Sequence, residues 1–138
     1  MQIFFDSSAF AKCYVREEGS EDVLLWCDRA AELALAVIAL PEIMSAFCRL
    51  QRENRITEGQ YRQLKTALFQ DVADIALCDL TPEVIQYAVR GLEAHTLRGM
   101  DAIHIGCALA WQAEVFISAD RRQCATAQAA GLQVVELR

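Results

Sequence analysis

The sequence has no apolar run long enough to span a bilayer. Crossing a bilayer takes about 20 consecutive apolar residues, whereas the longest run here, residues 33–41, suits a buried strand that leads into a helix. No basic segment precedes an apolar stretch at the N-terminus, so no signal peptide is expected. These absences predict a cytoplasmic protein with no membrane partner.

Positive charge is also scarce. Lysine occurs only at Lys12 and Lys65, and the formal net charge is −6. A protein that holds nucleic acid through a broad cationic surface carries a positive net charge. A nucleic-acid substrate would therefore have to be held by local arginines and by bound cations, which cancel acidic charge locally.

Two kinds of motif are missing as well. No glycine-rich turn follows a predicted strand, which excludes a Rossmann dinucleotide site. The six cysteines include no pair within ten residues of each other, so there is no CxxC motif. In a reducing compartment such cysteines are expected to be small buried hydrophobic residues and not zinc ligands or disulfides.

What the sequence does contain is the pattern of one globular domain, residues 1–138, with 54% hydrophobic and 23% charged residues. Short apolar segments alternate with helical periodicities. This alternation predicts an α/β fold, a three-layer α/β/α sandwich around a mostly parallel sheet of about four to five strands, with about seven helices. Strands are expected at residues 3–5, 33–39, 75–80, 115–117 and 134–135, and helices from residues 7, 20, 41, 57, 82, 100 and 120.

The first strand ends in an unusual way, because the apolar residues 3–5 run directly into Asp6. A carboxylate beside a core strand is costly unless it is paired or bound to metal. In open parallel sheets the carboxyl ends of the strands are where ligands bind. Asp6 is therefore predicted to serve a site at that edge of the sheet.

Three more acids occupy comparable positions. Asp120 follows the predicted strand at residues 115–117, while Glu42 and Asp101 stand in the first turns of helices. Taken singly, each is also explained by helix capping or by the helix dipole. Taken together with Asp6, they occupy positions that can converge at one end of a doubly wound sheet.

Four converging carboxylates are suited to one chemistry. Hard divalent cations such as Mg²⁺ and Mn²⁺ prefer oxygen ligands, and one or two such ions are expected here. A bound divalent ion can make water nucleophilic at neutral pH and can offset the charge of a phosphodiester. The four acids therefore predict hydrolysis of a phosphodiester by in-line attack of water.

The order and spacing of these segments resemble PIN-domain ribonucleases, most closely the VapC-type toxins of bacterial and archaeal toxin–antitoxin pairs. The resemblance implies a PIN fold, an RNA substrate, Mg²⁺ or Mn²⁺, a homodimer and a small antitoxin that blocks the site. It also implies that Asp6, Glu42, Asp101 and Asp120 are the metal-binding, catalytic acids. The segments that carry it are residues 5–9 with Lys12 and Tyr14, 17–20, 41–42 with 45–46, 101–104 with Ala108, 118–120 and 127–131.

Other polar residues lie near these acids in sequence. Ser8 and, by the resemblance, Ser118 are expected to support the acids with their hydroxyl groups. Arg121 and Arg122, with Lys12, are candidates for contacting a substrate phosphate or an antitoxin carboxylate, although a solvent-exposed role explains them equally well. His104, one helical turn after Asp101, is expected to be packed or hydrogen-bonded and not a metal ligand.

Competing families fail on particular residues. A phosphotransfer receiver domain needs a lysine near the last strands, and none is there. A haloacid-dehalogenase-like phosphatase needs a second aspartate at the position of Ser8. One alternative stays open, a PIN-like module that dimerises or binds RNA without cleaving it. The sequence also leaves open which RNA is cut, and whether the protein is a toxin or a stand-alone RNA-processing enzyme.

Overall fold

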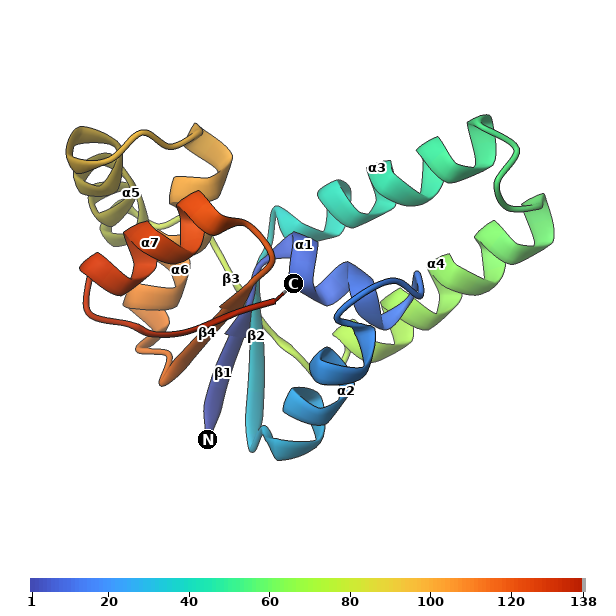
Figure 1. The fold of residues 1–138 in the computed structure, drawn as a ribbon, viewed down its shortest axis with the longest axis horizontal. Helices are drawn as coiled ribbons and strands as arrows, with labels where there is room; N and C mark the ends of the chain where they lie inside the picture. Colours follow the sequence, from blue (N-terminus) through green and yellow to red (C-terminus); the bar gives the residue numbers. More distant parts are fainter. Residues whose placement is uncertain (138) are drawn as a thin grey trace.

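The centre of the molecule is a five-stranded parallel sheet in the order β3-β2-β1-β4-β5. A computed structural model describes residues 1–137 of the chain, and Figure 1 shows the sheet between two groups of helices. The first strand is the central one, paired with β2 on one side and with β4 on the other. The strands are β1 (Gln2–Phe5), β2 (Glu32–Ala36), β3 (Ala76–Cys78), β4 (Val115–Ser118) and β5 (Gln133–Glu136).

Helices cover both faces of this sheet, as the α/β/α prediction requires, so the predicted fold class is confirmed. One short 3-10 helix, η1, continues directly from the first α-helix. The helices are α1 (Ser7–Phe10), η1 (Ala11–Cys13), α2 (Ser20–Arg29), α3 (Ala39–Arg52), α4 (Glu58–Val72), α5 (Pro82–Ala94), α6 (Gly99–Trp111) and α7 (Arg121–Ala129).

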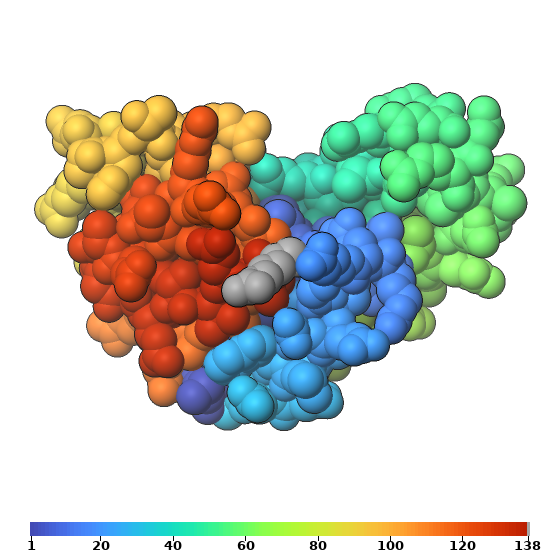
Figure 2. Space-filling view, in the orientation of Figure 1, coloured from blue at the N-terminus to red at the C-terminus, as the bar shows by residue number. Residues whose placement is uncertain are grey.

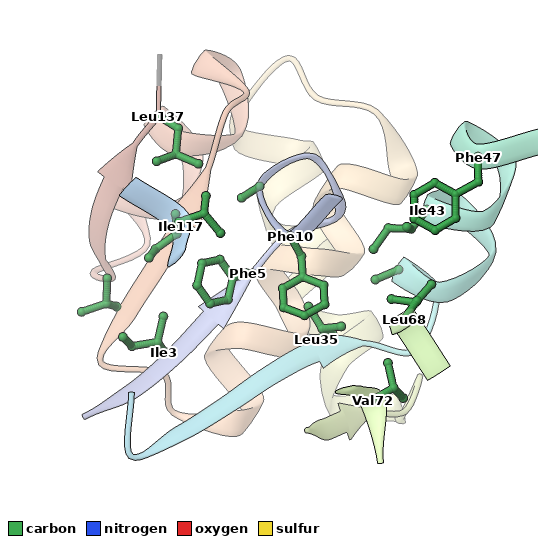
Figure 3. Packing of buried hydrophobic residues seen from close by; sticks show 14 residues of the cluster. Ile3, Phe5, Phe10, Leu35, Ile43, Phe47, Leu68, Val72, Ile117 and Leu137 are labelled. Atoms are coloured by element: carbon green, nitrogen blue, oxygen red, sulfur yellow. The ribbon is translucent and has the colours of Figure 1, made fainter. Parts of the chain in front are cut away.

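Alternate residues of the central strands enter two different cores. Ile3 and Phe5 point to the face covered by α1 to α4, where Figure 3 shows Phe5 near Phe10. Phe4 points to the opposite face and stacks on Phe116, with its ring centroid 5.8 Å from that of Phe116. The period of two along a strand explains the separation. A strand buried on both faces must be apolar throughout, as β1 is.

The strand order reverses between β1 and β4. From β1 the chain moves outward through β2 to β3, and it then returns to place β4 on the other side of β1. In doubly wound sheets this reversal opens a crevice at the carboxyl ends of the two strands. Asp6 directly follows β1 and Ser118 ends β4, so both lie at this crevice.

The long helices α3 and α4 form an antiparallel hairpin that projects away from the sheet in Figure 1. Thr57 caps α4 in a capping box, because its hydroxyl accepts from the Gln60 amide while the Gln60 side chain accepts from the Thr57 amide. None of the helices within residues 1–137 is long and apolar enough to cross a membrane.

The predicted start of one helix near the crevice is wrong. Helix α3 begins at Ala39 and not at residue 41, since a first-turn proline needs no N–H partner. Helix α2 begins at Ser20 as predicted. The Ser20 hydroxyl accepts a hydrogen bond from the amide of Glu17, and Gly19 with φ 92° precedes the helix. The first α-helix is short, because the chain tightens into η1 after Phe10.

Helices α5 and α6 make an unusually close approach. A Cβ atom built on Gly106 of α6 would lie 2.6 Å from the carbonyl oxygen of Val84 in α5. No real Cβ tolerates that distance, so only glycine lets the two backbones pack at this point. This packing holds α6, which carries Asp101, on the face of the sheet opposite α1 to α4.

Candidate metal centre

Asp6 is the most buried of the four predicted acids, with 3% of its surface exposed. Its carboxylate accepts hydrogen bonds from the Ala9 amide at 2.9 Å, from the Ser8 hydroxyl at 2.8 Å and from the Ser118 hydroxyl at 2.6 Å. All three donors are neutral. Burial raises the pKa of Asp6, against the lowering effect of these hydrogen bonds. The carboxylate is therefore held in place but lacks a full counter-charge.

Ser118 links Asp6 to Asp120. Its hydroxyl donates to Asp6 while its oxygen accepts from the Asp120 amide at 2.9 Å. On the same edge, the oxygen of Ser8 accepts from the Ala119 amide at 3.2 Å. Hydrogen bonds of both serines thus connect the end of β4 to the end of β1. These contacts are consistent with the supporting role predicted for the two hydroxyl groups.

Gln123 is a residue that the sequence reasoning missed. It is 1% exposed, and its side-chain nitrogen donates to the backbone carbonyl of Asp101 at 3.0 Å. Its backbone amide donates to Oδ1 of Asp120 at 3.0 Å, while its side-chain oxygen lies 3.1 Å from Oγ of Ser118. One glutamine therefore ties together the segments that carry Asp101 and Asp120. The sequence signal that could have identified Gln123 is its position three residues after Asp120, an aspartate that caps a helix.

Glu42 lies in the first turn of α3 and contacts His104 of α6. The two side chains approach to 2.7 Å between Nε2 and Oε1, and the Ser7 hydroxyl donates to the same oxygen at 2.6 Å. The hydrogen bond with His104 lowers the pKa of Glu42, against a smaller opposing effect of burial. Ser7 is next to Asp6 in the chain, so these contacts place Glu42 beside the Asp6 segment.

The proton on His104 can be assigned from its surroundings. Ser7 uses its single hydroxyl proton for Glu42, so Nε2–H of His104 is the donor to that carboxylate. The other ring nitrogen, Nδ1, is buried and has no partner among residues 1–137. A buried N–H without an acceptor is costly, so we assign the neutral tautomer with its proton on Nε2. The prediction of a hydrogen-bonded histidine in place of a metal ligand agrees with this geometry.

Asp101 is approached by a cation. Its side chain is 17% exposed, and Oδ2 lies 3.2 Å from Nε of Arg98. Arg98 precedes α6 in extended backbone conformation and makes no side-chain capping bond to that helix. The sequence reasoning did not single out Arg98, because its position in a loop carries no distinctive pattern.

Two surface cavities meet at Arg98 and Asp101. The first, of about 520 Å³, also contains Glu42 and an apolar wall from α5. The second, of about 460 Å³, is polar and also contains Asp120, Arg121 and Arg122. Figure 2 shows the surface hollowed between the α5–α7 side of the molecule and the α3–α4 hairpin. Because the cavities share two residues, they form one groove along the acidic edge.

The donor set fits a hard divalent cation, although no ready-made ligand cluster exists. Among residues 1–137, no three His, Cys, Asp or Glu side chains are spaced to hold an ion as they stand. Ser118 connects Asp6 to Asp120, and Gln123 connects Asp120 to the backbone of Asp101. The buried carboxylate of Asp6, with neutral donors alone, is the group that gains most from a cation. All four side chains supply the oxygen donors that Mg²⁺ and Mn²⁺ prefer.

Comparison with known proteins agrees with this arrangement. A family model described as PIN domain matches residues 3–129. The ribonuclease VapC45 of Mycobacterium tuberculosis is 35% identical over 137 residues, which cover 96% of this chain and 93% of that protein. The chain is a VapC-type member of the PIN-domain family.

Solved structures share the fold of this PIN domain. A toxin–antitoxin complex from Klebsiella pneumoniae matches with a TM-score of 0.69 at 14% identity, covering 96% of this chain and 95% of that one. VapC20 of M. tuberculosis, described as a toxin that cleaves the sarcin–ricin loop, matches with a TM-score of 0.67 at 18% identity, covering 99% and 98% of the two chains. At such identities the likeness shows the fold alone.

The three predicted cations of this PIN domain have different surroundings. Lys12 is buried, and its ammonium group binds the Glu17 carboxylate at 3.0 Å and the Glu18 carbonyl at 2.7 Å. These two partners already hold the ammonium group of Lys12 against the 17–20 loop. The structure therefore does not support a contact between Lys12 and a substrate or an antitoxin. Arg121 and Arg122 are exposed and line the polar cavity, as a role in binding anions requires.

Proposed function

We propose that this PIN domain is a metal-dependent endoribonuclease that hydrolyses RNA phosphodiesters by in-line attack of water. The observation that carries the proposal is the buried carboxylate of Asp6 at the reversal of strand order, bound by neutral donors alone. Hydrogen bonds connect it to the segments of the other three acids. Membership of the PIN-domain family, with a relative named a ribonuclease, supports the same conclusion.

The four acids would hold one or two Mg²⁺ or Mn²⁺ ions, with Asp6 at the buried end and Glu42, Asp101 and Asp120 around it. A bound divalent ion supplies a nucleophilic water at neutral pH and charge to stabilise the leaving oxygen. Ser118 and Gln123 hold the backbone at Asp120 and at Asp101 in place. His104 keeps Glu42 ionised and oriented.

The RNA would enter along the groove shared by the two cavities. Arg121 and Arg122 lie on its polar side and offer cationic donors to the phosphates that flank the scissile one. With a net charge of −6, such binding depends on local cations and not on a broad cationic field.

Cleavage assays test the nuclease proposal directly. We expect labelled RNA to be cut in the presence of Mg²⁺ or Mn²⁺ and to stay intact when EDTA is added. Asp101→Asn keeps the shape of the side chain but removes a charged ligand, so it should lower the cleavage rate at least about 100-fold. Cleavage that survives both chelation and this substitution would overturn the metal mechanism.

In its cellular role the protein would be the toxin of a toxin–antitoxin pair, working as a homodimer and blocked by a small antitoxin. The description of VapC20 as a toxin and the toxin–antitoxin complex from K. pneumoniae support this assignment. Induced expression should arrest growth, and the product of a short reading frame next to the gene should relieve the arrest. Normal growth on induction of a nuclease that is active in vitro would favour a stand-alone RNA-processing enzyme.

A further inference from the structure

Arg98 occupies the middle of the acidic groove. It is one of only two residues that line both cavities, the other being Asp101, so it lies between the Glu42 side and the Asp120 side. Its Nε atom lies 3.2 Å from Oδ2 of Asp101. The guanidinium group therefore already offsets negative charge where a divalent cation would do so.

The pairing of Arg98 with Asp101 is an i,i+3 contact at the start of α6, and it contributes little to helix stability. A cation at a helix N-terminus opposes the helix dipole, and Arg98 makes no capping bond there. Its side chain is 82% exposed, and the contact is a single one through Nε at 3.2 Å. Exposed pairs of this kind are weak, so Asp101 can exchange one partner for another.

We propose that Arg98 has two successive roles in the ribonuclease proposed above: it neutralises Asp101 while no metal is bound, and it binds an RNA phosphate once a divalent ion has taken that carboxylate. This inference rests on the proposed function. No bond is made or broken in the exchange, because the guanidinium group only changes the anion that it contacts.

The chemistry of arginine suits the second role. Guanidinium carries five N–H donors in a planar fork that matches the geometry of phosphate oxygens. Among residues 1–137, Arg98 has one hydrogen-bond partner, through Nε, so the donors on its two terminal nitrogens can serve other ligands. Release from Asp101 would turn the whole fork toward the groove, next to the cations Arg121 and Arg122 of the polar cavity.

Calorimetric titration with Mn²⁺ in the absence of RNA tests the first role. Because Arg98 competes for Asp101, we expect Arg98→Gln to bind Mn²⁺ about 2–5-fold more tightly than wild type. Arg62→Gln is the matched control, since Arg62 is also exposed and pairs with a nearby acid, Glu58, at 2.7 Å but lies outside the groove. Arg121→Gln removes the same charge from the polar cavity without freeing Asp101, so its effect should be smaller.

Binding of a fluorescein-labelled single-stranded RNA, followed by anisotropy with Ca²⁺ in place of Mn²⁺ and with the RNA checked by gel, tests the second role. We expect Arg98→Gln to bind about 5-fold more weakly. The slope of log Kd against log salt should fall by about 0.7, the value for one lost phosphate contact on a single strand. Arg62→Gln should match wild type in both quantities.

Each half of the inference can fail separately. Equal Mn²⁺ affinity in wild type and Arg98→Gln would overturn the competition for Asp101. An unchanged salt slope would overturn the phosphate contact, even if the RNA affinity fell. A wild-type protein that binds no Mn²⁺ at all would overturn the proposed function itself, which is a different result from equal binding by the two proteins.

Discussion

The hydroxyl of Ser118 lies 2.6 Å from Oδ2 of Asp6, although 112 residues separate the two in the chain. The contact follows from the pairing of β1 with β4, in which Phe5 is opposite Ile117. Asp6 and Ser118, which follow Phe5 and Ile117 in the chain, are therefore brought to the same edge of the sheet. This relationship determines how the buried carboxylate responds to substitution.

Asp6→Asn should stabilise the metal-free protein and abolish its function. Because burial raises the pKa of Asp6, the folded state favours the protonated form, and that contribution is lost as the pH rises through this raised pKa. Asparagine stays neutral and can keep the hydrogen bonds with Ala9, Ser8 and Ser118.

The measurement is differential scanning fluorimetry with EDTA at pH 5 to 8. We expect the melting temperature of Asp6→Asn to exceed that of wild type by roughly 2–8 °C at pH 8, with a smaller gap at pH 5. Added Mn²⁺ should stabilise wild type alone. An equal response of both proteins to Mn²⁺ would show that Asp6 is not a ligand.

Gln123→Leu should impair the site through the positions of its neighbours. Leucine has similar volume but cannot donate to the Asp101 carbonyl, so that group loses a hydrogen bond. We expect a loss of about 1–3 kcal/mol in the free energy of unfolding and a fall of about 10–100-fold in the rate of RNA cleavage. Gln128→Leu, at an exposed position of the same helix, is the control. Similar activity in the two variants would refute the bridging role.

Glu42 should make stability depend on pH in the opposite sense from Asp6. The His104 hydrogen bond lowers its pKa, so its contribution is present above the unfolded pKa and is lost as the pH falls through the lowered value. The side chain is 33% exposed, which limits the contribution to about 1 kcal/mol. Urea unfolding with EDTA should show wild type more stable than Glu42→Gln at pH 7, and the gap should shrink as the pH falls below the ordinary glutamate pKa of about 4.3 and through the lowered one. A gap that persists in acid would contradict the assigned charge.

Two glycine substitutions should have opposite signs. Gly106→Ala places a Cβ 2.6 Å from the backbone oxygen of Val84, which cannot retreat alone, so we expect a destabilisation of about 1–3 kcal/mol. At Gly59 in α4 the nearest atom would be 3.9 Å away, so Gly59→Ala should stabilise by about 0.5–1 kcal/mol. Urea unfolding of both variants measures the difference. A neutral Gly106→Ala would mean that α5 and α6 can separate without cost.

Sequence periodicity was sufficient for the architecture, because a strand buried on both faces must be apolar throughout. Residues 3–5 and 115–117 were therefore recognised within one residue of their observed ends. The start of α3 was not recognised. The N–H groups in the first turn of a helix are unpaired, so a proline fits anywhere in that turn and does not indicate which residue begins the helix.

The residues of the site divide in the same way, into those that a local sequence pattern reveals and those that it does not. The acids stood out because each follows a strand or opens a helix, positions that a local pattern reveals. The partners of Lys12 are also close in sequence, yet the bend that buries the ammonium group depends on Gly19 and on η1. Gln123 acts through Asp101, which lies 22 residues away in the chain and is brought near by tertiary packing. Arg98 pairs with Asp101 only three residues along, but no local pattern marks that pair as part of a site.

The central position of β1 also controls when the site can exist. A ribosome makes Asp6 112 residues before Ser118, and Gln123 is made later still. A nascent chain that ends before β4 therefore lacks one neighbour of its central strand and two of the residues that hold its acids. For an enzyme that cuts RNA, this order of synthesis delays cleavage until β4 and α7 have been made.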